Sequence, residues 1–193
     1  VLAAMLPWQF FSTALSESSN SLISNANLIS KVYFPRLIVP AGSVITSFVD
    51  FLITLGLMAS LMLWYSFAPD WRILSLPLFI VLAFGAAFGP GLWLCALNVK
   101  YRDFRYIVPF IVQFGLYISP VGFSSDNIPE QWQLAYACNP MVGVIDGFRW
   151  ALLRGEFPFP STALIASVLV TSVLCVSGIW YFHRTERTFA DVI

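Results

Sequence analysis

Four long stretches of this 193-residue chain contain no Asp, Glu, Lys or Arg. They are Ile73–Val99 and Phe157–His183, with 27 residues each, Tyr106–Ser125, with 20, and Phe51–Pro69, with 19. About 20 apolar residues in helical form cross the hydrocarbon core of a bilayer. One such run fits a buried helix of a soluble protein, but a chain this short cannot bury four. The sequence therefore predicts an integral membrane protein.

The composition supports the same class, because 59% of the residues are hydrophobic and 17% are aromatic, far outside the usage of soluble domains. We expect an all-α polytopic membrane protein that forms a single transmembrane domain over residues 1–193. The predicted spans are Val1 to about Ser21, Leu37–Phe67, Ile73–Leu97, Ile107–Pro120 with its extension, and Ala163–Phe182.

The first 16 residues carry no charge, and the chain opens on Val1 rather than Met. No basic segment or cleavage site of a signal peptide is present. We interpret this stretch as the latter part of a spanning helix, and we expect the sequence to be a fragment. Cys95, Cys138 and Cys175 stand singly, which favours buried thiols over a metal site or a disulfide.

The basic residues are unequally divided between the two sides that these spans define. Seven of the ten Lys and Arg residues fall on one side and three on the other. An excess of Lys and Arg in short loops marks the cytoplasmic face. The cytoplasmic set is Lys31, Arg36, Lys100, Arg102, Arg105, Arg184 and Arg187, and the outer set is Arg72, Arg149 and Arg154.

The first cytoplasmic loop contains the sequence SKVYFPRLIVP, from Ser30 to Pro40. Pro35 and Pro40 prevent one continuous helix from running through it. A short helix before Pro35, lying along the membrane, would present a lipid or partner surface made of Leu28, Val32 and Tyr33. The alternative is a simple anchor at the lipid headgroups.

An outer segment of about forty residues, Val121–Pro160, precedes the last span. Its part from Asn139 to Leu153 is mostly apolar and follows an Asn-Pro step that signals a helix start. Fifteen helical residues reach only about 22 Å, which favours a re-entrant or interfacial segment. Two short broken helices there would line or close a pathway, because irregular backbone at membrane depth needs shielding.

Three ionisable residues in apolar surroundings are functional candidates. Asp146 and Arg149 are three residues apart, so they share a helical face and can pair. The alternative is that both sit at headgroup depth and hold the segment at the interface. Asp50 lies inside an apolar run and is expected to face the protein interior rather than lipid.

Several kinds of catalytic signature are absent from the sequence. There is no Walker A loop, HExxH, GxSxG or cysteine-histidine cluster. The glycine-rich Gly85–Gly91 has no lysine, and we interpret it as a site of close helix packing. His183 is at a helix end beside Arg184, where it suits an interfacial anchor. The energy for uphill transport would have to come from a partner or an ion gradient.

Four motifs together resemble the membrane subunits of ABC-2-type polysaccharide exporters, the permeases for O antigen, capsular polysaccharide and teichoic acid. They are WQFFSTALSESSNSLISNANLISKVYFPRLIVP (Trp8–Pro40), NVKYRDFRYIVPF (Asn98–Phe110), NPMVGVIDGFRWALL (Asn139–Leu153) and ERTFADVI (Glu186–Ile193). They cover essentially the whole chain in the expected order.

The resemblance implies a full subunit with six spans and an amphipathic N-terminal helix, of which this chain would hold spans two to six. It also implies a homodimeric pore in the bacterial inner membrane with a cytoplasmic C-terminus. Each copy would bind a separate cytoplasmic ATPase through a coupling helix at Asn25–Arg36. The short helices Glu130–Cys138 and Pro140–Leu153 would be a re-entrant pair at the outer gate.

The resemblance also assigns roles to individual residues. Tyr33 and Phe34 would be packing anchors against the ATPase, and Lys31 and Arg36 would meet its acidic groups. The expected coupling loop is Lys31, Val32, Tyr33, Phe34, Pro35 and Arg36. A second cytoplasmic contact, or an ion pair within the loop, is expected from Lys100, Tyr101, Arg102, Asp103 and Arg105. The expected gate residues are Asn139, Pro140, Asp146, Arg149 and Trp150.

The expected cargo is a lipid-linked polysaccharide, which would move outward along aromatic and small polar side chains. The candidates for the channel lining are Trp8, Phe10, Phe11, Asp50, Tyr117, Phe123, Trp132 and Trp150. Most of the 32 aromatic residues (7 Trp, 7 Tyr, 18 Phe) must instead face lipid or pack between helices.

The expected partners are the ATPase, a second copy, the cargo and membrane lipid, without nucleic acid. No cofactor is expected in this chain, since the ATPase would bind ATP and Mg. The alternatives are an ABC-2 exporter of drugs or lipids, a membrane-embedded enzyme of glycan assembly, and a non-catalytic scaffold.

Overall fold

The computed structural model describes residues 2–26, 35–67, 70–101, 103–123, 125, 128–153, 159–186 and 189. Within these ranges the chain is all-helical and has no strand, as the sequence predicts. The helices are α1 (Leu2–Ser24), α3 (Ile38–Trp64), η1 (Trp71–Ser75), α4 (Leu76–Lys100), α5 (Phe104–Ile118), α6 (Glu130–Ala137), α7 (Pro140–Leu152) and α8 (Ser161–Thr185).

Three segments are long and apolar enough to cross a membrane: Ile38–Trp64, Trp71–Lys100 and Ser161–Thr185. They correspond to three of the five predicted spans, and they place this protein among multi-pass membrane proteins. Helix α1 has 23 residues, but its second half is rich in polar side chains. Helix α5 has 15 residues and so reaches about 22 Å, less than the thickness of a hydrocarbon core. The spans assigned to α1 and α5 stay predictions.

Local sequence explains where several helices begin. Helix α3 starts at Ile38, after Pro35, and Pro40 falls in its first turn, where a missing N–H costs little. Asp70 caps η1 by accepting a hydrogen bond from the backbone N–H of Trp71. Pro77 stands at the start of α4 in the same favourable way.

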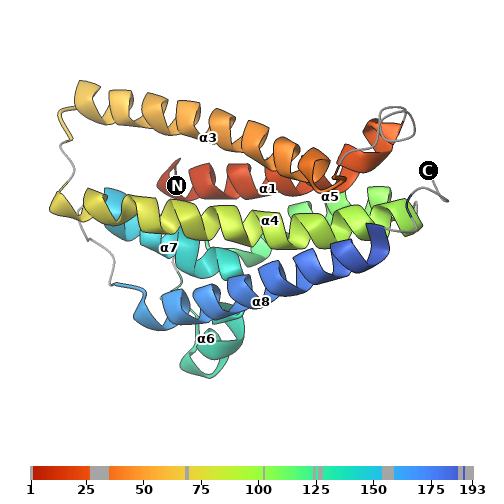
Figure 1. Ribbon diagram of the computed structural model, residues 1–193. Coiled ribbons are helices and arrows are strands. Elements are labelled where there is room, and N and C mark those ends of the chain that lie inside the picture. The colour runs from red at the N-terminus through yellow and green to blue at the C-terminus, as the bar shows by residue number, and fades with distance from the viewer. Residues whose placement is uncertain are drawn as a thin grey trace.

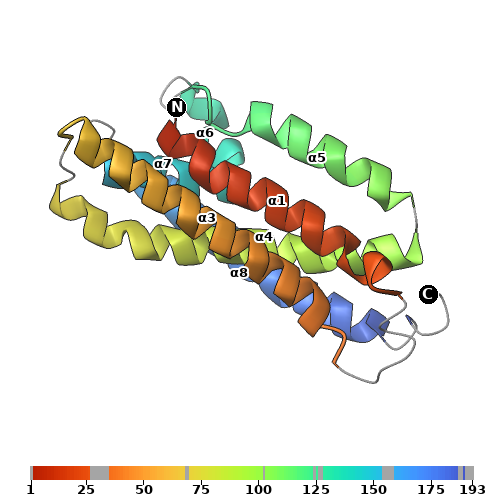
Figure 2. The ribbon, with the colours of Figure 1, turned by 90° about the horizontal axis from the view of Figure 1, so that it is seen from above.

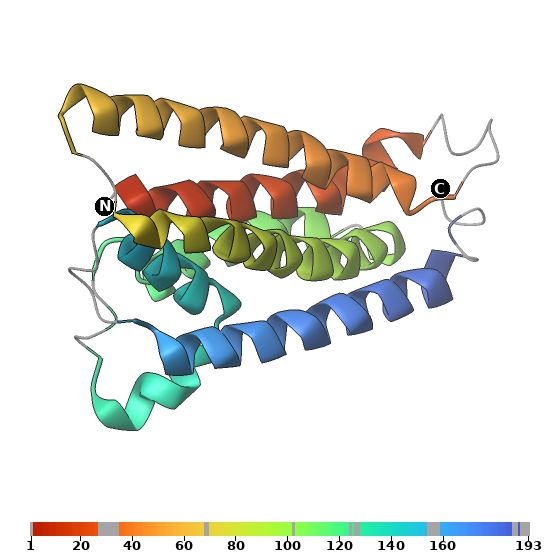
Figure 3. The same cartoon turned by 60° about the vertical axis from the view of Figure 1, so that its left-hand side comes forward.

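The long helices lie side by side along one axis, with α4 in contact with α1, α3, α7 and α8 (Figure 1). Seen from above, α1 lies between α3 and α5 (Figure 2). One end of the bundle contains the end of α1, the start of α3, the α4–α5 connection and the end of α8. The α3–η1 connection and the start of α8 are at the other end (Figure 3). The two groups match the two sides assigned from the basic residues.

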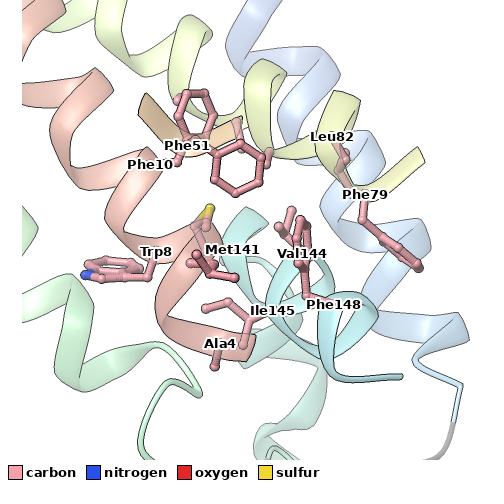
Figure 4. Packing of buried hydrophobic residues seen from close by; sticks show 14 of the residues in the cluster. Ala4, Trp8, Phe10, Phe51, Phe79, Leu82, Met141, Val144, Ile145 and Phe148 are labelled. Carbon is pink, nitrogen blue, oxygen red and sulfur yellow. The ribbon is translucent and has the colours of Figure 1, made fainter. Parts of the chain in front are cut away.

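An aromatic cluster forms the core between α1, α3, α4 and α7. The ring of Phe10 lies 5.3 Å from that of Phe51, and Phe51 lies 6.1 Å from Phe148, measured between centroids. Phe148 and its neighbours Met141, Val144 and Ile145 project from α7 into this cluster (Figure 4). Helix α7 is therefore almost wholly buried against the bundle, although it is too short to cross a membrane.

Helices α4 and α8 approach each other through glycines. A Cβ atom on Gly89 would lie 2.7 Å from the backbone N of Cys175, and one on Gly178 would lie 2.5 Å from the carbonyl O of Gly89. Such distances are too short for any side chain, so the two backbones touch at this point. The packing role predicted for Gly85–Gly91 is confirmed. Stacked rings of Trp93 and Tyr181, with centroids 4.4 Å apart, continue the contact.

The outer faces of α3, α5 and α8 carry large apolar side chains that are exposed in the single chain, such as Ile53, Phe114 and Val173. Contiguous apolar surface of this extent marks contact with a membrane or with another protein. Because these helices are also long or strongly apolar, the exposed faces fit contact with lipid.

Candidate transport pathway and coupling surfaces

Asn139 joins the start of α7 to the segment that follows α5. Its Oδ1 accepts a hydrogen bond from the backbone N–H of Met141 at 3.0 Å, which caps the helix. Its Nδ2 donates to Ser119 Oγ at 3.0 Å. Pro140 follows at the first helical position, where its fixed φ favours helix initiation. The Asn-Pro step thus begins the helix that the sequence predicts there.

The predicted pairing of Asp146 with Arg149 is confirmed. Arg149 Nη1 lies 3.7 Å from Asp146 Oδ1, and both residues are buried, with 6% and 8% of their surface exposed. Arg149 also donates from Nη1 to the carbonyl of Phe123 at 2.8 Å and from Nη2 to the carbonyl of Val121 at 3.1 Å. Two backbone acceptors outside any helix are therefore satisfied by one guanidinium.

Asp146 contacts the same irregular segment through its other oxygen. Ser125 Oγ donates to Asp146 Oδ2 at 2.5 Å. The two charged residues of α7 together hold parts of the chain from Val121 to Ser125 against the helix. The two charges neutralise each other and are hydrogen-bonded to nearby groups. Both effects lower the free-energy cost of burying the ion pair.

Tyr136, on α6, faces this pair. Burial raises the pKa of its phenol above the ordinary value, the carboxylate of Asp146 raises it further, and Arg149 acts in the opposite direction. The phenol therefore stays protonated at any physiological pH. Its hydroxyl oxygen is buried and has no hydrogen-bond partner in the part of the chain that the structure describes.

Trp150 lies at the end of α7 and contacts two other segments. Its ring meets that of Phe159 edge to face, with centroids 5.0 Å apart. The guanidinium carbon of Arg72, from η1, is 5.3 Å from the centroid of the Trp150 ring. All five predicted gate residues lie on α7 or at its start, and within the described contacts an ion pair joins only Asp146 and Arg149 among them. Their role in gating stays a prediction.

Most of the predicted coupling loop, Lys31–Phe34, lies outside the described residues, and so do Leu28 and Arg102. Pro35 and Arg36 are described. Arg36 Nη1 donates to the backbone carbonyl of Glu186, just after α8. This bond lies within the chain, and the expected contact of Arg36 with acidic groups of a partner stays a prediction.

The second loop that the sequence assigns to the cytoplasmic side lies at the same end of the bundle as Arg36 (Figure 1). The Lys100 Nζ atom is 5.2 Å from the centroid of the Tyr101 ring. Asp103 and Arg105 are exposed. Nearby, the rings of Phe182 and Phe189 pack with centroids 5.5 Å apart, so Phe189 contacts α8. The exposed groups remain available to a partner.

A groove of about 250 Å³ between α1 and α3 is lined entirely by polar side chains. They are Thr13 and Glu17 from α1, and Ser43, Thr46, Ser47 and Asp50 from α3. The Thr13 and Thr46 hydroxyls donate to carbonyls four residues earlier, at 2.9 and 3.0 Å. Neither Glu17 nor Asp50 forms an ion pair within the described ranges.

Asp50 is twelve residues into α3, about 18 Å along the helix axis from its start. It therefore lies near the middle of a helix long enough to cross a membrane. Its side chain is exposed in the single chain and lines the groove, so it faces α1 rather than the packed core. Charged groups at such depth face a bundle interior or a water-filled cavity.

The other lining candidates divide into two groups. Phe11, Phe123, Trp132 and Tyr117 are partly or fully accessible. Trp8 and Phe10 are buried in the single chain, with 4% and 2% exposed, and the channel-lining role expected for all these residues stays a prediction. Trp8 is buried because Gly115 of α5 leaves room for it: a Cβ there would lie 2.7 Å from Cη2 of the indole.

Several residues that form these sites were missed at the level of sequence. Thr13, Ser16, Glu17 and Asn20 have the spacing i, i+3, i+4, i+7 of one helical face, and Ser43, Thr46, Ser47 and Asp50 repeat it. A search for polar periodicity within apolar helices would have found the groove. Ser125 and Tyr136 carry no such signal, because their partners are distant in sequence.

Comparisons with known proteins identify the family of the chain. Residues 1–153 match the family model of the ABC-2 type transporter. Over its whole length the chain is 25% identical to the O-antigen export system permease protein RfbA of Klebsiella pneumoniae, covering 74% of that protein. It is 26% identical to the RfbA protein of Myxococcus xanthus, covering 75% of it. With three long apolar helices and a family match over most of its residues, the chain belongs to the ABC-2 type transporter family.

Proposed function

We propose that this protein is the membrane-spanning permease subunit of an ATP-driven polysaccharide exporter. It moves a lipid-linked polysaccharide from the cytoplasm across the bacterial inner membrane. A separate cytoplasmic ATPase subunit binds ATP and Mg, and a second copy of the permease completes the path. All five of the predicted spans cross the membrane, and α6 and α7 form a re-entrant pair at the outer gate.

The observation that carries this proposal is the similarity to O-antigen export permeases from two bacteria, which extends over the entire chain. A match restricted to a few apolar helices would support membrane insertion alone. Here the similarity includes the polar loops and the short helices α6 and α7.

The groove between α1 and α3 supports a polar cargo. Its hydroxyls are bonded to their own helices, and its two carboxylates, of Glu17 and Asp50, are not paired within the described ranges. Such a surface is unfavourable against lipid. A hydrated glycan chain, or water that accompanies it, satisfies these groups during transport.

The orientation follows from the charges at the two ends of the bundle. The end that contains Arg36, Lys100 and Arg105 holds most of the basic residues and faces the cytoplasm. The ATPase docks there, on the loop Asn25–Arg36 and on the exposed residues of the second loop. The outer gate is then at the opposite end, where α7 packs against the start of α8.

Deletion of the full-length gene in its host tests the function directly. Completed lipid-linked polysaccharide should accumulate in the cytoplasm, as measured by fractionation, and the wild-type gene should restore it to the surface. Normal amounts of polysaccharide at the surface of the deletion strain would contradict the proposal and would favour a drug or lipid cargo.

A double alanine substitution at Tyr33 and Phe34 tests the coupling loop. Because aromatic anchors dominate interface energies, the variant should lose co-purification with the ATPase and should fail to restore export. The control is a double alanine at Trp64 and Tyr65, an exposed aromatic pair at the other end of α3. That variant should keep the ATPase bound. Equal co-purification of both variants would exclude a coupling role for Tyr33 and Phe34.

A further inference from the structure

A hydrogen bond ties the residue that follows α8 to the segment that leads into α3. Arg36 Nη1 donates to the backbone carbonyl of Glu186, which is the C-terminal cap residue of α8. The last carbonyls of a helix have no partner within the helix and carry partial negative charge, so they favour a guanidinium. His183 fixes the side chain of the same residue, with Nδ1 3.1 Å from the Glu186 carboxylate. Arg36 therefore caps α8 from outside that helix.

Phe189 provides a second, apolar contact of the C-terminal segment. Only 1% of its surface is exposed, and its ring meets that of Phe182 edge to face, with centroids 5.5 Å apart. A large aromatic ring that is buried in this way strongly stabilises the arrangement around it. The ring belongs to a cluster of buried side chains from α1, α4 and α8, which also contains Leu22, Leu92, Cys95, Ala96, Val99 and Phe182.

The start of α3 shares this apolar cluster. Leu37 and Val39, on either side of the first residue of α3, pack against it. The polar bond of Arg36 and the apolar contacts of its neighbours therefore hold the same short stretch of chain. Because close-packed side chains move together, a shift of the start of α3 must be shared by Phe189 and the end of α8.

Helix α8 connects these contacts to the other end of the molecule (Figure 3). Its 25 residues extend about 37 Å. Close to its start, Ser167 Oγ accepts a hydrogen bond from the backbone N–H of Gly143 in α7, at 3.1 Å. Rigid helices carry displacement between distant sites. A displacement at the end of α8 is therefore passed to the helices around its start.

We propose that Glu186 and Phe189 form a strap that joins the start of α3 to the end of α8, so that movement of the loop before α3 is passed along α8. The inference rests on the proposed function, which places the docking of the ATPase on that loop. It gives a role to the motif Glu186–Ile193, which neither the pathway nor the docking loop uses. Phe189 is the positioning residue to test, because Arg36 also belongs to the docking loop.

Hydrogen exchange of the full-length permease alone, in lipid nanodiscs, tests whether the strap exists. The amides of Ile38 and Val39 are hydrogen-bonded in the first turn of α3, at 3.1 and 3.3 Å. Phe189→Ala should accelerate their exchange at least about tenfold, because the loss of a buried ring weakens what it fixes. Phe114→Ala, at an exposed ring of α5, is the matched control and should leave their exchange unchanged. Unchanged exchange in Phe189→Ala would overturn the strap. Equal acceleration at Tyr65, at the other end of α3, would also overturn it, because it signals general destabilisation.

Export in the host separates transmission of movement from simple attachment. Phe189→Ala should keep the ATPase bound in co-purification, since the docking loop is unchanged, and should lose export. Phe189→Leu, which keeps a large apolar side chain at the buried position, should restore export. Full export by Phe189→Ala, or loss of the ATPase from it, would overturn transmission through the strap.

Gene deletion keeps the strap and the proposed function apart. Loss of export in the deletion strain, combined with full export by Phe189→Ala, would leave the proposed function intact and remove the strap from the mechanism. Normal surface polysaccharide in the deletion strain would instead refute that function. The exchange of the α3 amides would still decide whether the strap is present.

Discussion

Replacing Arg149 with methionine is expected to lower the free energy of unfolding by about 3–5 kcal/mol, the usual cost of removing one partner of a buried ion pair. The methionine preserves much of the side-chain volume but leaves the Asp146 carboxylate without its opposite charge. It also removes the donors to the carbonyls of Val121 and Phe123. Stability would be measured by unfolding the full-length protein with SDS in mixed micelles, followed by tryptophan fluorescence.

A double-mutant cycle identifies the source of this loss. Asp146→Asn in the Arg149→Met background removes the uncompensated charge while keeping an acceptor for Ser125. The double variant should therefore lose less stability than the two single variants combined. Arg184→Met is the matched control, because Arg184 is exposed and its guanidinium contacts the Trp180 ring, an interaction that contributes up to about 1 kcal/mol at exposed sites. Additive losses, or an Arg149→Met variant as stable as the control, would contradict the role assigned to the pair.

The sequence predicted the helices well because the signals that define them are local. Long apolar runs between charged residues located α3, α4 and α8, and the Asn139–Pro140 step located the start of α7. The pairing of Asp146 with Arg149 was also predictable, since both are on one helix at a fixed spacing. In each case the information was contained in a short stretch of neighbouring residues.

Contacts between distant residues could not be predicted in this way. Nothing near Trp8 in the sequence indicates that Gly115 leaves room for its indole, so the burial of this side chain in the single chain could not be foreseen. The bonds from Arg149 to the carbonyls of Val121 and Phe123 depend on how the chain turns after α5. A cavity beside Tyr136 arises only where α6, α7 and the start of α8 meet.

The positions of these contacts divide the end of the bundle at which α6, α7 and the start of α8 meet into rigid and adjustable parts. Helix α7 is fixed to the core by its apolar face and to the turn after α5 by Asn139 and Arg149. The described contacts of α6 with α7 and α8 are fewer, and the cavity lies along its inner side. Any opening of this end is therefore expected to displace α6 more readily than α7, because displacing α7 disrupts the aromatic core.

The second large effect is expected at the closest approach of α4 and α8. Gly178→Ala places a methyl group 2.5 Å from the carbonyl O of Gly89, and the obstacle is backbone, which cannot rotate aside. The two helices must separate, and their neighbours, including the stacked Trp93 and Tyr181 rings, must shift with them. Overpacking typically costs about 1–3 kcal/mol, and we expect the upper part of this range.

Gly56→Ala provides the opposite case within the same protein. A Cβ on Gly56 meets no atom within 4 Å, so it gains helix propensity without a clash. This variant should be as stable as the wild type or more stable by up to about 1 kcal/mol. Replacing glycine by alanine thus has opposite effects on stability at the two positions. A general intolerance of substitution in spanning helices would instead destabilise both variants. Equal stability of Gly178→Ala and Gly56→Ala in the same SDS titration would mean that α4 and α8 are not in backbone contact.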